Sequence, residues 1–190
     1  MYNLKIDRII EALLFSNPKP LDQKMIDKIF PNEKINLSEI IIQLNEKYNN
    51  EDHAFEISMI AGGYQLISKK EYEYYIKLIL DNTSKFKPSK PALDTLAIIA
   101  YKQPVSRNEI ESIRGVDSSG VLKTLLTNDL IKISGRSNSP GKPLLYKTTK
   151  KFLEFFGLND LTELPKLKEI KQLIESDIIL GEQIAVFNNS

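Results

Sequence analysis

The sequence contains no cysteine and a single histidine among its 190 residues. Without cysteine, disulfide scaffolds, thiolate nucleophiles and cysteine-ligated zinc sites are excluded. Long hydrophobic runs are absent as well. Residues 1–15 are interrupted by charged side chains, unlike a signal peptide, and no later run reaches membrane-spanning length. These absences predict a soluble, cytoplasmic protein that does not contact a membrane.

Patterns that support catalysis are also missing. His53 lies in a polar stretch before an expected strand, where a lone histidine is predicted to be solvated. The string Gly141-Lys142-Pro143 has proline where a phosphate-binding loop requires Ser or Thr. Glu109 and Glu111 are two residues apart on an expected helix and therefore point to different faces. The sequence predicts a protein that is not an enzyme, with no cofactor, no metal and no small-molecule substrate.

Charge is distributed unevenly along the chain, although the net charge is only +1. Residues 86–156 carry 12 Lys and Arg against 6 Asp and Glu, whereas residues 1–85 carry 11 against 13. Residues 157–190 carry 3 against 6. The middle of the chain is therefore basic, and both flanks are mildly acidic.

The basic segment shows three short helix patterns followed by a hairpin pattern. A helix is expected over Ala92–Tyr101. Ser106 with Glu109 has capping-box spacing for a second helix, which ends at Gly115. A third helix opens at Ser118 or Ser119. Alternating strands are then expected over Leu130–Ser134 and Leu144–Thr148, joined by a Gly/Pro/Ser-rich turn. This order of elements predicts a winged helix.

The first half repeats that order less clearly. Its expected helices are an amphipathic one ending at Asn17-Pro18, a second over Leu21–Phe30 and a third capped by Ser38. Strands are expected over Phe55–Ile60 and Tyr64–Ser68 around Gly62-Gly63, with a further helix over Tyr72–Leu80. The predicted fold is mainly α with small β-hairpins (α+β), in two tandem winged-helix domains and a C-terminal helical tail. The predicted bounds are 1–80, a linker at 81–90, 91–157, and an acidic tail at 158–190 with a helix from Lys166 to Ile184.

Several uncommon strings occur in an order that resembles one bacterial family. They are LAIIAYKQPVSRNEIESIRGV, SSGVLKTLL and GKPLLYKTTKKFLEFFGL, with IIEALLFSNPKPL, AGGYQLIS and LTELPKL around them. The chain in this way resembles segregation and condensation protein B, ScpB, over about residues 6–167. Two departures, Lys142 and Lys147, keep or add positive charge.

The resemblance implies a non-catalytic accessory subunit of the Smc–ScpA–ScpB complex. Such a subunit binds the kleisin ScpA, reaches Smc indirectly through ScpA, and acts on the nucleoid in chromosome condensation and partition. The resemblance also implies a homodimer through the first winged helix. The apolar row that we expect to serve both the core and the dimer contact comprises Ile6, Ile9, Ile10, Leu13 and Leu14.

The second winged helix is expected to hold a segment of the kleisin. Phe155 and Phe156 are adjacent on an expected helix, so its core cannot absorb both, and such excess apolar surface indicates a partner. Arg114 and Leu158 complete the predicted contact set. Ion pairing of Arg107 or Arg114 with Glu111 is the alternative use of these arginines.

The cations of the expected wing support a second hypothesis. Between Ile131 and Lys151 there is no acidic residue, so the wing can follow a phosphate backbone. The alternatives are that hairpin tips simply need polar residues, or that the protein is a winged-helix transcription regulator. Because the expected recognition helix lacks arginine, we predict at most weak, non-specific DNA contact. The residues concerned are Lys132, Arg136, Lys142 and Lys147.

Overall fold

A computed structural model describes residues 5–80 and 86–166. The expected helix over Lys166–Ile184 therefore falls outside the described residues, apart from its first residue. Residues up to Asp160 belong to one compact unit, and a second unit begins at Leu161. Of the second unit, the structure describes residues 161–166, which begin with a short 3-10 helix, η2 (Leu161–Glu163).

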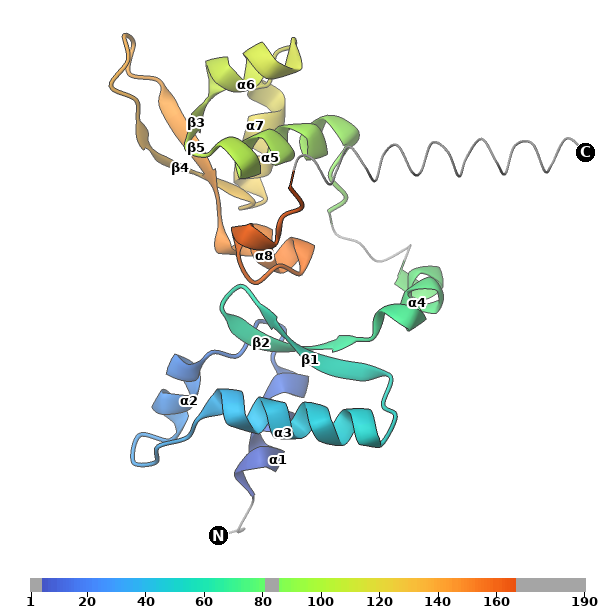
Figure 1. The fold of residues 1–190 in the computed structure, drawn as a ribbon. Coiled ribbons are helices and arrows are strands. Elements are labelled where there is room, and N and C mark those ends of the chain that lie inside the picture. Colours follow the sequence, from blue (N-terminus) through green and yellow to red (C-terminus); the bar gives the residue numbers. More distant parts are fainter. Residues whose placement is uncertain (1–4, 81–85, 167–190) are drawn as a thin grey trace, which may run out of the picture. The chain divides into compact units, whose positions relative to one another are not determined.

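The first half contains three helices, a hairpin and a further helix, in the expected order (Figure 1). The three-helix segment is formed by α1 (Ile6–Ser16), α2 (Gln23–Ile29) and α3 (Leu37–Asn50). The antiparallel strands β1 (Phe55–Ile60) and β2 (Gly63–Ser68) follow, and then η1 (Lys70–Tyr72) and α4 (Glu73–Leu80).

Three details of the first half differ from the sequence-based expectation. The helix α2 starts later than predicted, because Asp22 caps it and Leu21 instead pairs with Tyr64 through two backbone hydrogen bonds of 2.7 and 2.8 Å. Ser38 lies inside α3, and Asn36 occupies the N-cap position. The hairpin turn is Ala61-Gly62, both with positive φ, while Gly63 is the first residue of β2.

The core of the first half is built from the inner faces of these helices and β1. Its buried residues are Ile10, Leu14, Leu21, Ile26, Leu37, Ile41, Leu44, Tyr48 and Ile57. Tyr48 is 2% exposed, and its hydroxyl donates a 2.9 Å hydrogen bond to Glu11 on α1. The Arg8 guanidinium donates a 2.7 Å hydrogen bond to the same carboxylate. The hydrogen bond from Arg8 lowers the pKa of Glu11, and the hydrogen bond from the Tyr48 hydroxyl lowers it further. Partial burial raises the pKa, but the net shift is downward.

Replacing Tyr48 by Phe is expected to lower the free energy of unfolding by about 1 kcal/mol at pH 7, because the buried end of α3 loses its hydrogen bond to Glu11. The pKa of Glu11 is lower in the folded state than in the unfolded state. The ionised Glu11 carboxylate therefore stabilises the fold fully at pH values above its unfolded pKa, and this stabilisation is lost as the pH falls through its folded pKa. The cost of Tyr48→Phe should therefore shrink in acid. Urea denaturation followed by circular dichroism measures this cost.

The matched control is Tyr64→Phe on β2, because Tyr64 is half-buried in the same half and its hydroxyl forms no hydrogen bond with another described residue. This variant should unfold like the natural chain at both pH values. A Tyr48→Phe cost that is the same at pH 7 and pH 3 would show that the hydroxyl stabilises the fold without the Glu11 carboxylate.

The second half repeats the order of three helices and a hairpin, with one added strand. The helices are α5 (Lys90–Lys102), α6 (Arg107–Arg114) and α7 (Ser119–Thr127), and α8 (Lys150–Phe156) follows the hairpin. The hairpin consists of β4 (Ile131–Arg136) and β5 (Leu144–Thr148), and β3 (Val105–Ser106) pairs with β5, so the sheet order is β3-β5-β4. The described part of the chain is thus mainly helical with small antiparallel sheets.

Local signals at α6 and α7 are confirmed. The Ser106 side chain and Glu109 form the predicted capping box, and Gly115 ends α6 in the left-handed conformation with φ 71°. Ser118 is the N-cap residue of α7, and Leu122 and Leu125 bury its inner face. The apolar side chains buried in this half come from all four helices and from the sheet.

Candidate partner-binding surfaces

The helix α8 ends in two exposed phenylalanines. Its first turn is capped by Thr149, which accepts a hydrogen bond from the N–H of Phe152, and Phe152 is only 3% exposed. Phe155 and Phe156 are 43% and 42% exposed. Their ring centroids lie 5.1 Å apart, edge to face, and Phe156 lies 4.9 Å from the buried Phe152 ring. The two residues form one exposed aromatic surface, here called the aromatic pair, which Phe152 anchors to the core.

Leu158 lies just beyond the aromatic pair and is half-buried. Its N–H donates to the Leu153 carbonyl at 2.9 Å, and its own carbonyl accepts a 2.9 Å hydrogen bond from the N–H of Ala61. The neighbouring Asn159 side chain accepts from the Gly62 N–H at 2.9 Å. The backbone at Leu158 is therefore already engaged by the turn of the first hairpin, and only part of its side chain remains accessible.

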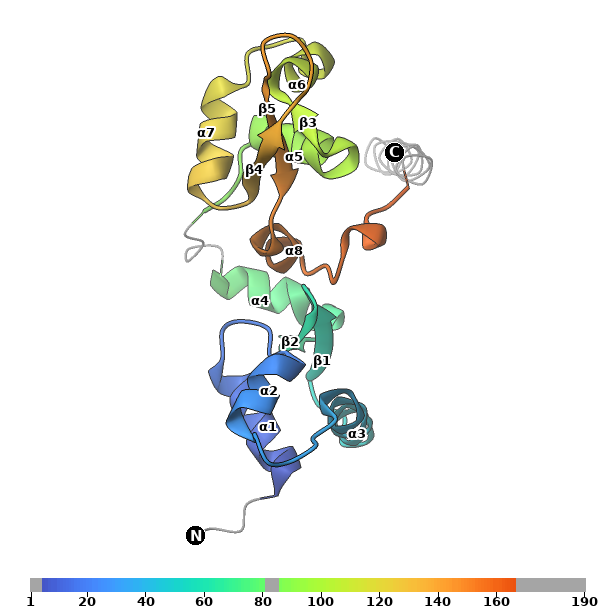
Figure 2. The same ribbon diagram turned by 90° about the vertical axis from the view of Figure 1, so that its left-hand side faces the viewer.

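Arg114 is separate from the aromatic pair. It ends α6, and its guanidinium donates a 2.8 Å hydrogen bond to the fully buried Ser118 hydroxyl. Arg107, not Arg114, pairs with Glu111 and Asp117, at 2.6 Å each. Hydrogen bonds from the Ser118 N–H and from Arg107 lower the pKa of Glu111. Because α6 and α8 lie at opposite ends of this half (Figures 1 and 2), the structure does not bring Arg114 together with the aromatic pair.

The apolar row of α1 serves mainly the core of its own half. Ile10 and Leu14 are 0% and 4% exposed, so a partner cannot reach either side chain in the folded chain. The half-buried members of the row are Ile6, Ile9 and Leu13. The most exposed apolar side chain on this helix is Phe15, at 81%, which the predicted row did not include.

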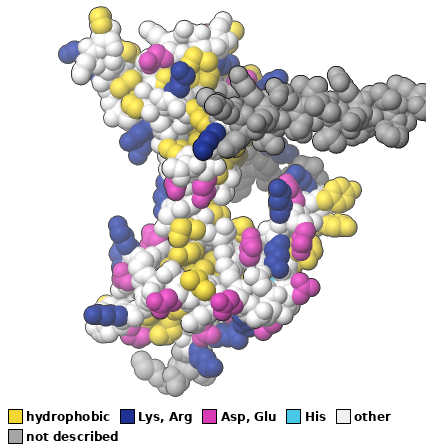
Figure 3. Space-filling model, viewed as in Figure 1, with side chains coloured by type: hydrophobic (Ala, Val, Ile, Leu, Met, Phe, Trp, Pro, Cys, Tyr) yellow, Lys and Arg dark blue, Asp and Glu magenta, His cyan; other side chains and the backbone are white. Residues whose placement is uncertain are grey.

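A larger exposed apolar surface lies on α4, where sequence reasoning did not place a site. Tyr74, Tyr75, Leu78 and Ile79 are 67%, 66%, 64% and 76% exposed. Their spacing puts all four within about 140° of one another around the helix axis, and Figure 3 shows apolar side chains projecting there. This α4 stripe could have been recognised from its spacing, but spacing alone does not distinguish a stripe that faces the core from one that faces a partner.

The four predicted DNA contacts lie on the β4–β5 hairpin and are all exposed. Lys132 and Lys147 are directly opposite each other on the two strands. By contrast, α7 offers little for reading bases. The Thr124 hydroxyl donates to the Gly120 carbonyl at 3.1 Å, and the Asn128 amide donates to the Thr124 carbonyl at 2.9 Å. These polar side chains are bonded to their own helix, which disfavours a transcription regulator that reads operator sequence.

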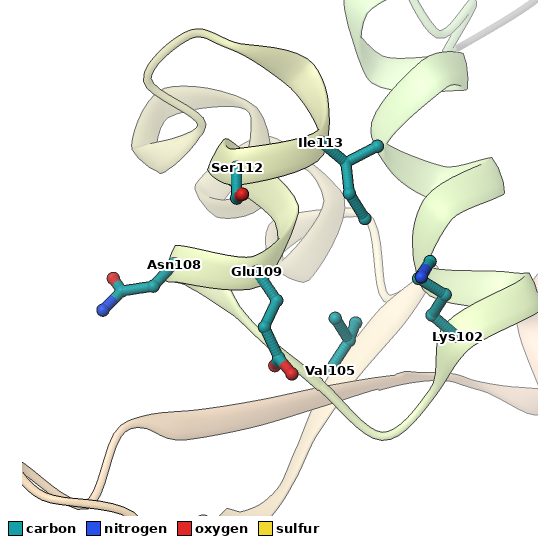
Figure 4. A pocket seen from close by; sticks show the side chains of 6 residues that line it. All are labelled: Lys102, Val105, Asn108, Glu109, Ser112 and Ile113. Atoms are coloured by element: carbon teal, nitrogen blue, oxygen red, sulfur yellow. The ribbon is translucent and has the colours of Figure 1, made fainter.

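A shallow groove of about 500 Å³ lies between the end of α5 and α6 (Figure 4). The carboxylate of Glu109, which lines this groove, accepts hydrogen bonds of 2.7 and 2.6 Å from the Ser106 N–H and hydroxyl. These bonds lower the pKa of Glu109, so the carboxylate holds the helix cap and is a poor proton acceptor. The other lining residues are Lys102, Val105, Asn108, Ser112 and Ile113.

Residues 5–80 and 86–166 show neither a metal-binding cluster nor a membrane-spanning helix. That part of the chain contains no group of three His, Cys, Asp or Glu side chains placed to hold a metal ion. None of its helices combines the length and apolarity needed to cross a bilayer. The ring of His53 stacks on Phe55 at 4.8 Å and lies 2.9 Å from the Glu51 carboxylate, so it is packed on one face and not simply solvated as expected.

Comparison with known proteins gives a consistent set of relatives. The family model described as segregation and condensation complex subunit ScpB matches residues 8–167. Segregation and condensation protein B of Clostridium tetani is 40% identical over 174 residues, which cover 92% of this chain and 92% of the relative.

Two solved structures are also similar. ScpB from Mycobacterium tuberculosis is 26% identical, with 80% of this chain and 94% of that chain covered and a TM-score of 0.38. A dimer of an ScpB N-terminal domain complexed with ScpA peptide is 24% identical, with 38% of this chain and 91% of that chain covered and a TM-score of 0.34.

Proposed function

Since this chain belongs to the segregation and condensation complex subunit ScpB family, we propose that it binds the kleisin ScpA as a non-catalytic subunit of an Smc complex. In that complex it acts in chromosome condensation and partition during cell division, in the cytoplasm and at the nucleoid. The observation that carries the proposal is the family match over residues 8–167. The chemical work belongs to the Smc ATPase, which this chain contacts through ScpA.

The proposed architecture is two tandem winged helices. It is supported by the repeated order of three helices and a hairpin, first in α1 to β2 and again in α5 to β5. We retain the domain bounds 1–80 and 91–157, with a linker at 81–90 and a tail at 158–190. The extra strand β3 lies directly after the first helix of the second half and pairs with β5 of its hairpin.

The aromatic pair is the proposed kleisin contact. Exposed aromatic side chains fixed by a buried neighbour lose little conformational entropy when they bind, and they are frequent anchors of protein interfaces. Leu158 can contribute the accessible part of its side chain at the rim. Arg114 is proposed only as a positioning residue for the α6–α7 turn, because its hydrogen bonds are made within that turn.

The chain is proposed to form a homodimer through its first half, with the α4 stripe at the centre of the contact. A two-fold interface uses the same patch on both copies, and four large apolar side chains on one short helix provide such a patch. The α1 row contributes only its half-buried members.

The proposed function is tested with the full chain and the full-length kleisin from the same organism. Isothermal titration at physiological salt should give a complex with a dissociation constant of micromolar or tighter. The control is a kleisin of an unrelated bacterium, which should bind more weakly. No heat of binding and no co-elution at tens of micromolar would refute the proposed function.

A further inference from the structure

The β4–β5 hairpin and the residues after it form a continuous basic segment. Residues 130–151 contain six Lys and Arg and no Asp or Glu; we call this segment the basic hairpin. Its strands place Lys132 directly opposite Lys147, and both side chains are exposed. Figure 3 shows Lys and Arg side chains at the edge of this part of the molecule.

The Lys132–Lys147 pair is unfavourable for folding by itself. Like charges directly opposite on antiparallel strands repel each other and destabilise the pair. Arg107 of the same half, by contrast, is neutralised by Glu111 and Asp117. In the described part of the chain, no carboxylate forms an ion pair with Lys132, Lys147, Arg136 or Lys142. Because no carboxylate of the described residues neutralises the Lys132–Lys147 pair, we expect an anion from outside the chain to bind there and relieve the repulsion.

The tip of the hairpin adds two more cations in a defined arrangement. The Arg136 guanidinium donates a 3.1 Å hydrogen bond to the Lys142 carbonyl, which holds the two residues beside each other. The Ser137 N–H donates to the Pro143 carbonyl at 2.8 Å, and the Ser137 and Ser139 hydroxyls are hydrogen-bonded to each other. These hydrogen bonds within the hairpin hold the tip in one conformation without a ligand.

We propose that the basic hairpin binds the phosphate backbone of duplex DNA without reading its sequence. An acidic protein segment is the competing ligand, but a protein interface needs an apolar centre, and the exposed large apolar side chain on this hairpin is Ile133, at 47%. Thr124 and Asn128 of α7 are hydrogen-bonded to their own helix and are therefore not free to contact bases. Contact with phosphate is then the main source of affinity for DNA. This inference goes beyond kleisin binding and does not depend on it.

The test measures fluorescence anisotropy of a labelled 30-base-pair duplex with the full chain between 50 and 200 mM KCl. Four phosphate contacts predict that log K falls with log[KCl] with a slope of about −3.6, so affinity drops by about 100-fold over this range. The variant Lys132→Gln/Lys147→Gln should bind at least ~10-fold more weakly at 50 mM and have a slope of about −1.8.

The control variant is Lys24→Gln/Lys34→Gln, which removes the same charge from exposed positions in the first half. It should bind DNA like the natural chain. Thermal melting provides a second readout: Lys132→Gln/Lys147→Gln should melt at the same or a higher temperature, because it removes repulsion. A merely structural role for the two lysines predicts a lower melting temperature instead.

Three results would each overturn the inference. The first is equal loss of DNA binding in the hairpin variant and the control variant. The second is a preference of more than about tenfold for one duplex over scrambled duplexes, which would indicate sequence reading. The third is tighter binding of a labelled polyglutamate peptide than of the duplex, which would indicate an acidic protein partner.

Discussion

A chain with Phe155 and Phe156 both replaced by serine should bind full-length kleisin about 1,000-fold more weakly than the natural chain. Each aromatic anchor at the centre of an interface typically contributes about 2 kcal/mol or more, and each 1.4 kcal/mol is tenfold in affinity. The fold should persist, since the substituted side chains are 43% and 42% exposed and the anchoring Phe152 is retained. Isothermal titration measures the affinity, and circular dichroism checks the fold.

The matched control is Val116→Ser/Ile133→Ser, which removes two comparably exposed apolar side chains, 56% and 47%, from the same half. Its affinity for the kleisin should stay within about threefold of the natural value. Arg114→Ala should also have a small effect on binding. Unchanged affinity of the phenylalanine variant, together with a large loss in the control or in Arg114→Ala, would move the kleisin site to the α6 end of this half.

The second half was the more predictable part of the fold, because its signals are local. The capping box of Ser106 and Glu109 and the left-handed Gly115 depend on backbone hydrogen bonds within a few residues, so spacing alone identifies them. The strand β3 was missed for the opposite reason. It has two residues, and its pairing of Val105 with Tyr146 exists only once the chain has folded.

The first hairpin shows how tertiary contacts override a turn signal. Gly62-Gly63 is a favourable turn pair by sequence, yet the turn is Ala61-Gly62. A Cβ atom on Gly63 would lie 2.9 Å from the Cβ of Pro20 and 3.1 Å from the carbonyl oxygen of Leu21. Glycine is therefore needed at position 63 so that the segment before α2 can pair with β2, a requirement that no local pattern reveals.

The candidate sites were predictable only in part, because an apolar pattern does not say which neighbour covers it. Phe155 and Phe156 exceed what one short helix can bury, so adjacency alone indicates an exposed surface. The α1 row has the ordinary spacing of a core-facing helix, and Ile10 and Leu14 are buried in the core of the same chain. On α4 the same kind of spacing remains exposed, a difference that requires coordinates.

The variant Leu78→Glu/Ile79→Glu should convert a dimer into a monomer at about 10 µM, with a dimer dissociation constant raised at least ~1,000-fold. Burying an unpaired carboxylate costs several kcal/mol. Because both copies contribute the same patch to a two-fold interface, each substitution introduces two carboxylates into the contact. The single chain should still fold, because these positions are 64% and 76% exposed and glutamate is a good helix former. Light scattering after gel filtration measures the mass.

Two further variants decide which surface holds the second copy. Ile42→Glu, on α3 and 58% exposed in the single chain, should remain dimeric and controls for added negative charge. Phe15→Glu probes the α1 side, where the side chain is 81% exposed. If Phe15→Glu gives a monomer while the α4 variant stays dimeric, the contact runs along α1 and the α4 stripe serves another partner. A natural chain that is monomeric at this concentration would refute the dimer altogether.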